Sequence, residues 1–223
     1  MSSQINLLQR IERTLRFPAK IAAELVEFTE RIAPDVSSDF YLPLIQKLVQ
    51  TRQTQLNGAI FAFSAISPGE GVTYVIGKIA SELSRHSGET VMVATAASLY
   101  GLEPAQCEGV DPETSRSARV WRLARTYPES QLDTGSLHPE SLQLLRKRFG
   151  YVLVDCPALK ESAAAFSVAA IVEGIVLVVA AGEARRDQIE QAQTALQSSS
   201  CNLLGLVLNK RTEPVPKLIT KFI

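Results

Sequence analysis

The sequence SAISPGEGVT at residues 64–73 joins two segments of different periodicity. It follows the apolar run Ala59 to Phe63 and precedes apolar residues at helical spacing, from Val75 to Leu83. An apolar strand that enters a Pro-Gly-x-Gly turn and then a helix is the layout of a phosphate-binding loop. In such a loop, glycines let backbone N–H groups approach a phosphate at the N-terminus of the helix. The stretch therefore predicts a strand, a turn shaped for an anion, and a helix.

The side chain that gives such a loop its charge is missing. The pattern requires Gly-Lys-[Ser/Thr], but Gly71 is followed by Val72 and Thr73, and Ile66 stands where the first glycine belongs. The lysine neutralises phosphate charge in phosphoryl transfer, and valine has neither a charge nor a donor. We expect a loop that has kept its backbone shape and lost its chemistry.

Apolar strands alternate with helical segments through the rest of the chain. Strands are expected at 59–63, 90–94, 118–124, 151–154, 174–180 and 203–208, and the helices between them at 75–83, 139–148, 163–170 and 185–196. The segment from Tyr100 to Ser117 has no periodicity and is predicted to be a loop. The alternation predicts an α/β fold, with a doubly wound, mostly parallel sheet, helices on both faces, and a ligand edge where the strands end.

Amphipathic patterns precede the first strand. Two helices broken at Pro18 are expected between Ile5 and Ile32, and a third from Phe40 to Leu48. We divide the chain into an N-terminal helical extension, 1–57, and an α/β domain, 58–223. The helices are expected to pack on the domain's own sheet, and a partner-binding arm is the alternative.

Composition excludes several classes of function. Lys+Arg and Asp+Glu both number 23, so the net charge is zero and gives no general attraction to nucleic acid. No apolar run approaches the roughly 20 residues of a membrane span, so we expect a cytoplasmic protein. The two histidines have no plausible second ligand nearby, and we expect no metal site. The three cysteines lack CxxC spacing and are expected to be buried thiols: Cys107, Cys156 and Cys201.

Four segments, in order, carry a resemblance that covers roughly residues 60–216. They are Pro68 to Gly71, Tyr151 to Pro157, Gly174 to Arg186 (GIVLVVAAGEARR) and Gly205 to Asn209 (GLVLN). In these, the chain resembles the cytoplasmic domain of bacterial tyrosine kinases of capsule and exopolysaccharide systems. Those kinases belong with the septum-placement and plasmid-partition ATPases of the deviant phosphate-loop class. The resemblance implies a P-loop NTPase-like fold for residues 58–223.

The resemblance also assigns roles to individual positions. Val72 stands where the family has its lysine, Thr73 keeps the hydroxyl that would bind magnesium, and Asp155 keeps the third motif's aspartate. The two aspartates of the second motif fall on Thr95 and Ala97, so both are lost. No tyrosine follows Tyr151 to form the phosphorylated tail, and the family's arginine-bearing oligomerisation helix is not visible.

These losses predict a non-catalytic, pseudokinase-like scaffold or regulatory component of polysaccharide synthesis and export, not an enzyme. The alternatives are a weak ATP-binding kinase or ATPase, with Lys78 as the nearest substitute lysine in sequence, or an activator of an active relative. No cofactor is expected, and residual ATP or ADP binding with magnesium is the open alternative. Asp155 would hold magnesium through water or simply cap the turn. The residues for residual nucleotide or anion binding are Pro68, Gly69, Glu70, Gly71, Thr73, Asp155 and Asn209.

The expected partner is a membrane-embedded chain-length regulator or an active kinase relative, which would place the protein at the inner face of the membrane. Homo-oligomerisation and peripheral membrane contact through the C-terminal tail are also open. The arginines at 116, 119, 122 and 125 are interpreted as solvated charges, not as a nucleic-acid site. Interface residues are predicted at Arg185, Arg186, Leu218 and Phe222.

Overall fold

The structure, a computed structural model, describes residues 25–27, 38–100, 102–107, 119–123 and 137–210. Its strands are β1 (Leu25–Glu27), β2 (Ala59–Ala65), β3 (Val91–Thr95), β4 (Val120–Leu123), β5 (Tyr151–Asp155), β6 (Gly174–Ala180) and β7 (Leu203–Asn209). Its helices are the 3-10 helix η1 (Ser38–Tyr41) and α3 (Leu42–Gln53), α4 (Val72–Ser87), α5 (Ala96–Tyr100), α6 (Pro104–Cys107), α7 (Pro139–Arg148), α8 (Ala164–Ala169) and α9 (Arg186–Ser198).

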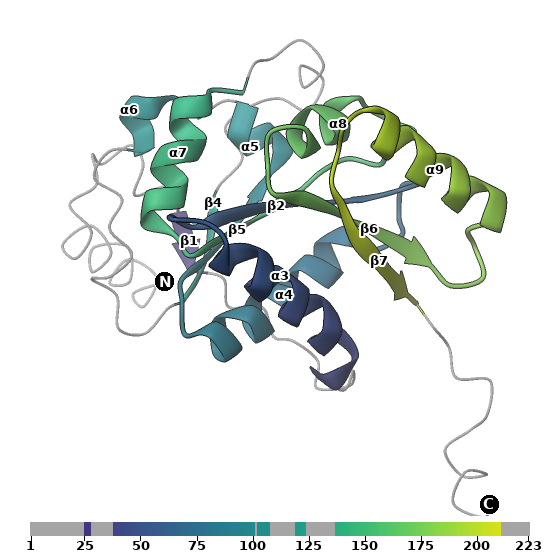
Figure 1. Ribbon diagram of the computed structural model, residues 1–223, viewed down its shortest axis with the longest axis horizontal. Helices are drawn as coiled ribbons and strands as arrows, with labels where there is room; N and C mark the ends of the chain where they lie inside the picture. Colours follow the sequence, from purple (N-terminus) through teal and green to yellow (C-terminus); the bar gives the residue numbers. More distant parts are fainter. Residues whose placement is uncertain (1–24, 28–37, 101, 108–118, 124–136, 211–223) are drawn as a thin grey trace, which may run out of the picture.

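The strands form one seven-stranded sheet in the order β1-β4-β3-β5-β2-β6-β7 (Figure 1). The pairs between β4 and β7 are parallel, and β1 pairs antiparallel with β4 at one edge. Chain order and strand order differ because helices cross between parallel strands that are not adjacent in sequence. The predicted α/β class with a mostly parallel, P-loop NTPase-like sheet is confirmed.

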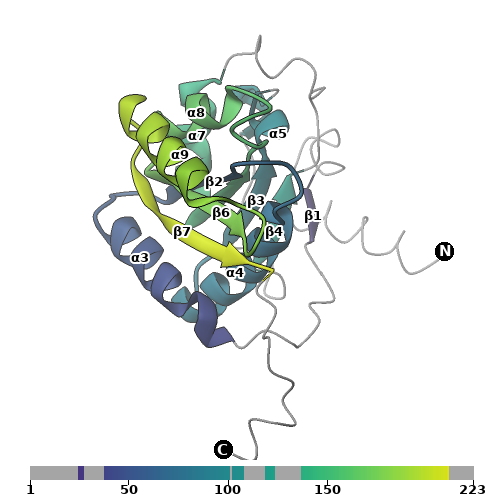
Figure 2. The same cartoon turned by 90° about the vertical axis from the view of Figure 1, so that its right-hand side faces the viewer.

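Helices cover both faces of the sheet (Figure 2). Helices α3 and α4 lie on one face, and α5, α7, α8 and α9 lie on the other. Strand residues alternate between the two cores: Phe61 and Phe63 pack with α4, whereas Ile60 and Ala62 pack toward α8. Strands buried on both faces are continuously apolar, which explains why the central strands were identifiable from sequence.

The helix predicted at Phe40 to Leu48 is confirmed as α3, which starts with Pro43 in its first turn. Its buried residues Ile45 and Leu48 share a core with α4 and the sheet, so this helix packs on the domain's own sheet as expected. The helix expected across Ile21 to Ile32 is wrong at Leu25–Glu27, because these residues pair with β4 as a strand. The other residues before Ser38 lie outside the described part.

Two connections also differ from expectation. The residues 95–98, expected to be a strand end, turn at Thr95 into helix α5, because the Thr95 hydroxyl accepts a hydrogen bond from the Ser98 N–H at 3.1 Å. Within the predicted loop from Tyr100 to Ser117, Pro104–Cys107 forms the short helix α6, which packs on α7. Both helices are too short for a sequence periodicity to reveal.

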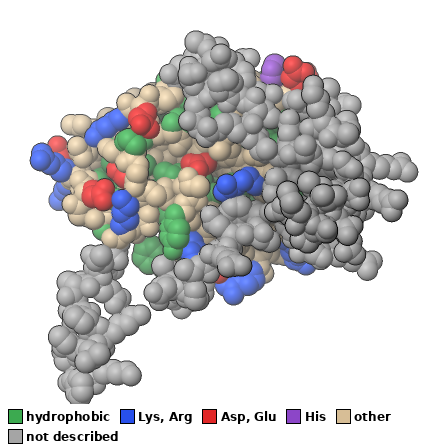
Figure 3. All heavy atoms as spheres, turned by 180° about the vertical axis from the view of Figure 1, so that it is seen from behind, with side chains coloured by type: hydrophobic (Ala, Val, Ile, Leu, Met, Phe, Trp, Pro, Cys, Tyr) green, Lys and Arg blue, Asp and Glu red, His purple; other side chains and the backbone are tan. Residues whose placement is uncertain are grey.

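The carboxyl ends of the parallel strands meet at one edge. Asp155 at the end of β5 is in register with Phe63 of β2 and Thr95 of β3, and Ala180 of β6 is in register with Asn209 of β7. The turn between β2 and α4 therefore lies among the ends of its neighbouring strands. On the face turned away from Figure 1, described basic and acidic side chains are interspersed (Figure 3). Among the described residues of this face, the basic side chains do not form one continuous patch.

Candidate functional site

The turn from β2 to α4 has the backbone of an anion loop. Gly69 and Gly71 both adopt positive φ angles, 82° and 92°, a conformation that L side chains rarely take. Gly71 precedes the first residue of α4, and its carbonyl accepts a hydrogen bond from the Val75 N–H at 3.1 Å. The glycines are thus required by the turn, as the sequence pattern predicted.

Asn209 fastens the loop to the end of β7. Its side-chain amide donates to the Glu70 carbonyl at 2.8 Å, across 139 residues of sequence. A Cβ atom at Gly71 would collide with the same amide, so the glycine is needed for this close approach as well as for its backbone angle. The structure brings Asn209 to the loop, and its part in nucleotide or anion binding stays a prediction.

Thr73 and Asp155, the two groups that the resemblance connects with magnesium, contact each other. The Thr73 hydroxyl donates to Asp155 Oδ2 at 2.6 Å, joining the first turn of α4 to the end of β5. The pair has the oxygen ligands that magnesium prefers, although protein magnesium sites usually add substrate phosphates. Across the described residues, no group of three or more His, Cys, Asp or Glu side chains is placed to hold a metal.

Glu70 turns its side chain into the protein and is only 3% exposed. One carboxylate oxygen accepts a hydrogen bond from the Ser67 N–H at 3.3 Å, and the other, Oε2, has no hydrogen-bond partner among the described residues. Burial raises the pKa of this carboxyl, Glu183 adds to the rise, and the N–H groups of Ser67, Ile66 and Ala180 oppose it. An ionised Glu70 places negative charge beside the loop and opposes a bound anion.

Val72 contributes packing in place of charge. It is partly buried against the core that α3 and α4 share with the sheet. Lys78, the substitute suggested by proximity in sequence, is 7% exposed, and its ammonium lies over the ring of Tyr74, 5.5 Å from the centroid. The Lys78 ammonium therefore makes a cation–π contact within α4.

Lys160 is a neighbour of the loop that sequence reasoning missed. Its ammonium donates to the Ser67 hydroxyl at 3.3 Å, from the connection between β5 and α8. The two residues are 93 positions apart, so no local spacing connects them. A lysine a few residues beyond a strand end was a weak signal in the sequence, because such residues are common on surfaces.

The positions where the resemblance places the second motif, 95–97, lie at the end of β3 and in helix α5 and do not form a turn like the loop. Ala96 and Ala97 in α5 are each 1% exposed and belong to the core between the sheet, α7 and α8. Thr95 is bonded to Ser98, with 2.9 Å between the two hydroxyl oxygens. A carboxylate at Ala97 would enter an apolar core, so the packing at this position opposes the carboxylate that the resemblance implies.

The predicted interface residues are only partly described. Arg185 and Arg186 are exposed at the start of α9, and Arg186 pairs with Glu190 at 2.9 Å. Leu218 and Phe222 lie outside the described residues. Of the predicted arginine stripe, Arg119 donates to the Gly88 carbonyl at 2.8 Å and Arg122 lies in β4, consistent with a strand, not a basic helix face.

The cysteines have no catalytic character. All three are buried and free. Burial raises the pKa of Cys107 to about 11 and also raises the pKa values of Cys156 and Cys201. Because the thiolate is the reactive form, these thiols are poor nucleophiles at neutral pH.

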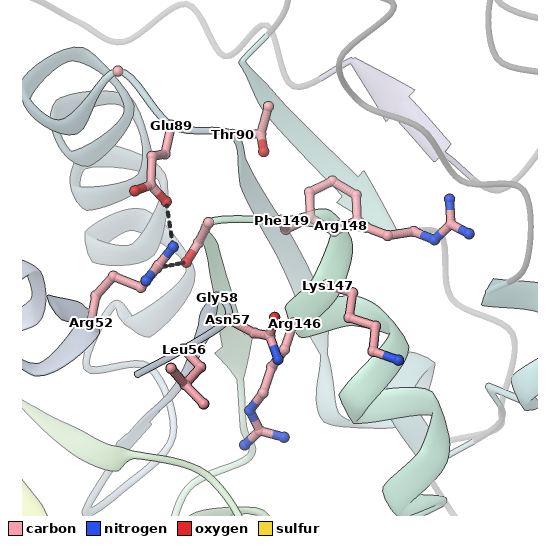
Figure 4. A pocket seen from close by; sticks show the side chains of 12 residues that line it. Arg52, Leu56, Asn57, Gly58, Glu89, Thr90, Arg146, Lys147, Arg148 and Phe149 are labelled. Atoms are coloured by element: carbon pink, nitrogen blue, oxygen red, sulfur yellow. Dashed lines mark hydrogen bonds and ion pairs between the residues drawn. The ribbon is translucent and has the colours of Figure 1, made fainter. Parts of the chain in front are cut away.

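A hollow of about 480 Å³ lies at the opposite edge of the sheet, where β2, β3 and β5 begin (Figure 4). Arg52 of α3 reaches across it, donates to the Gly150 carbonyl at 3.2 Å and lies 3.4 Å from Glu89. Arg146, which also lines it, pairs with Glu173 at 3.0 Å. Both arginines thus have partners within the protein.

None of the helices in the described residues is long and apolar enough to cross a membrane.

Curated proteins similar in sequence to this chain include tyrosine-protein kinases named CpsD. The sequence is 31% identical over 74 residues to the tyrosine-protein kinase CpsD of Streptococcus agalactiae, and the match spans 33% of this chain and about a third (32%) of that protein's length. It is 22% identical over 215 residues to CpsD of Streptococcus pneumoniae serotype 4, covering 86% of this chain and 89% of that protein. No family model matches the sequence.

Solved structures share the fold. The kinase domain of VpsO aligns with a TM-score of 0.63 at 18% identity, over 78% of this chain and 94% of that one. The tyrosine kinase domain of BceF aligns with a TM-score of 0.60 at 18% identity, over 90% of this chain and 96% of that one. At these identities the likeness establishes the fold and leaves the chemistry to be argued from the residues.

Proposed function

The chain is homologous to the CpsD tyrosine kinases and related to the tyrosine kinases of capsule and exopolysaccharide systems, and from this premise we propose that it is a non-catalytic scaffold or regulator in such a system. The loop at 66–73 would serve for binding or for shape, not for phosphoryl transfer. The weak kinase or ATPase remains the alternative that the experiment below separates from this proposal.

The main observation behind the proposal is that the loop keeps its backbone shape while its position 72 lacks the expected positive charge. Gly69, Gly71 and Asn209 hold the turn in shape, while Val72 packs into the core where a lysine would point its charge at phosphate. Catalysis of phosphoryl transfer depends on positioning and on charge stabilisation, and single cationic groups contribute several powers of ten in rate. A loop without that charge, beside a buried carboxylate, is suited to binding or to holding shape, and not to phosphoryl transfer.

The second-motif segment supports the same proposal. Where the resemblance places two carboxylates, the chain has Thr95, bonded within α5, and Ala97, buried in the core. A water or metal ion positioned by that motif would have no ligand there. Two separate parts of the machinery that the resemblance implies therefore lack their charged side chains, which favours a lost activity over a single tolerated substitution.

Partners are proposed on the same basis. Helix α3 buries Ile45 and Leu48 in the domain's own core, whereas the start of α9 is exposed and follows shortly after the end of β6. We expect a membrane-embedded chain-length regulator or an active kinase relative to contact Arg185 there. Arg186 is 93% exposed at its side chain and would join the same contact. Loss of co-purification with such a partner in the Arg185→Ala, Arg186→Ala double variant would support this surface.

The test of the function is turnover by the purified chain. ATP hydrolysis and autophosphorylation, followed with radiolabelled ATP and magnesium, are expected to be absent from the wild type. Val72→Lys is expected to strengthen ATP binding without restoring turnover, because the second-motif carboxylates are still missing. Any turnover by the wild type that is lost in Asp155→Asn would overturn the proposal and establish the weak enzyme instead.

A further inference from the structure

Among the described residues, Lys160 is a lysine in contact with the loop, and it lies in the connection between β5 and α8. Lys160 Nζ donates to the Ser67 hydroxyl at 3.3 Å, and Ser67 is also the residue whose N–H binds Glu70. Among the described residues, this ammonium hydrogen-bonds to the Ser67 hydroxyl and forms no ion pair with a carboxylate. An ammonium has three donors, so two remain available for a ligand.

The backbone next to Lys160 is anchored along β2. The Leu159 N–H donates to the Ala65 carbonyl at 2.8 Å, and the Cys156 N–H donates to the Phe63 carbonyl at 2.9 Å. The Ser64 hydroxyl donates to the Pro157 carbonyl at 2.7 Å. Because the residue before Lys160 is tied to the last residue of β2, the lysine starts its reach from a fixed point beside the loop. Its side chain remains exposed, so the ammonium can turn between Ser67 and a ligand.

The charges at the loop make this lysine necessary for anion binding. Glu70 and Asp155 bring two carboxylates into the loop's contacts, and Lys160 is the ammonium that contacts it directly. The N-terminus of a helix contributes only about half an elementary positive charge. Without Lys160, the described groups that contact the loop would be negative on balance, and a phosphate would be repelled.

We infer that Lys160 supplies the positive charge for a phosphate group bound at the loop 66–73, in place of the side chain that Val72 lacks. The ligand class is a phosphate group, carried by a nucleoside diphosphate or triphosphate or present as free phosphate. This inference rests on the proposed function and takes the first of its two options, that the loop serves for binding. It concerns binding alone, because an ammonium at Ser67 does nothing to restore the missing second-motif carboxylates.

The experiment is calorimetric titration of the full chain with ATP, ADP and inorganic phosphate, each with and without magnesium. The wild type is compared with Lys160→Ala, Lys160→Arg and the matched control Lys147→Ala, which removes an exposed lysine at the opposite edge of the sheet. We expect Lys160→Ala to weaken binding at least about tenfold, Lys160→Arg to keep most of it, and Lys147→Ala to stay within about twofold. The thermal unfolding of all variants should coincide.

The inference would be overturned by the absence of binding of all three probes to the wild type up to millimolar concentration, or by equal affinities for the wild type and Lys160→Ala. An equal loss in Lys147→Ala would also overturn it, because the effect would then be one of general charge. Binding of nucleotides but not of phosphate would assign the source to a nucleotide, and equal competition by phosphate would assign it to the free ion. ATP hydrolysis in the same samples tests the proposed function separately. Turnover together with Lys160-dependent binding would overturn the proposed scaffold role and would not contradict the role of Lys160 in phosphate binding.

Discussion

The loop at 66–73 and the segment at 95–98 both lack the charged side chains that the family resemblance implies, and they differ in what takes the place of those side chains. In the loop, the backbone angles of Gly69 and Gly71 persist and a single side chain, Val72, has replaced the expected charge. After β3, the chain forms the helix α5, whose alanines are buried between the sheet and its covering helices. One site has changed its side chain, and the other has changed its packing.

The difference matters because introducing a charged side chain would destabilise the fold to different extents at the two sites. A lysine at position 72 would start from the first residue of α4 and could extend toward solvent. A carboxylate at position 97 would have to enter a close-packed apolar core, where an unpaired charge is costly. The loop is thus the part of the site where a charged side chain could be accommodated, and α5 is the part where packing opposes one.

The sharpest test of this comparison restores the second motif's carboxylates one at a time. Ala97→Asp should lower the free energy of unfolding by about 3–5 kcal/mol at pH 7, because it buries an unpaired charge. Thr95→Asp should cost about 1 kcal/mol, because Thr95 is only half-buried and aspartate also caps helices well. Urea unfolding measures both. If Ala97→Asp proved as stable as Thr95→Asp, α5 would not be the packed replacement described above.

A second test asks whether the loop's shape depends on its glycines. Gly71→Ala should cost about 2–3 kcal/mol, the sum of about 1–2 kcal/mol for a left-handed alanine and about 1 kcal/mol for the displaced Asn209 hydrogen bond. Gly69→Ala is the matched control, because its φ is also positive but nothing lies within 4 Å of an added Cβ, so only the backbone cost applies. Thermal and urea unfolding of both variants give the difference.

The role of Asn209 in that difference can be isolated. In an Asn209→Ala background, Gly71→Ala should cost no more than Gly69→Ala, since the collision is gone. An unchanged excess cost would mean that Asn209 does not hold the loop.

The smallest expected effect concerns the buried carboxylate. Glu70→Gln should raise stability at pH 7 by about 1 kcal/mol, because it removes a charge with an unpartnered oxygen and keeps an acceptor for the Ser67 N–H. The pKa of Glu70 is raised in the folded state, so wild-type stability is favoured below the unfolded pKa and declines as pH rises through the folded one. The advantage of the variant should therefore appear at neutral pH and disappear in acid.

Glu183, a charged neighbour of Glu70, provides the control for the Glu70→Gln variant. Glu183 also raises the pKa of Glu70, but it is exposed and pairs with Lys210 at 3.1 Å. Glu183→Gln should therefore change stability little at any pH, which chemical unfolding from pH 4 to pH 8 would show. An equal response of both variants would mean that the effect is general charge reduction and not the buried site.

Sequence reasoning succeeded where a pattern was long or locally complete. The central strands, β6 at Gly174–Ala180 for example, are continuous apolar runs because both faces are buried, and α7 was predicted with its observed bounds, Pro139 to Arg148. It failed at Leu25–Glu27, where pairing with β4 overrides a weak helical pattern, and at α5, where a threonine cap starts a helix of five residues. Short elements are set by their tertiary neighbours more than by propensity.

The sequence by itself determined the α/β alternation, the glycine turn at 68–71, and the absence of a lysine at position 72, because these depend on residue identity and local spacing. Only the tertiary structure decided which residues surround the turn. Asn209 lies 139 positions from the loop residue it binds, Lys160 lies 93 positions from Ser67, and the burial of Glu70 depends on packing around the loop. Parallel strands bring their ends together from distant parts of the chain, so a site at their edge is assembled by topology and cannot be found from spacing alone.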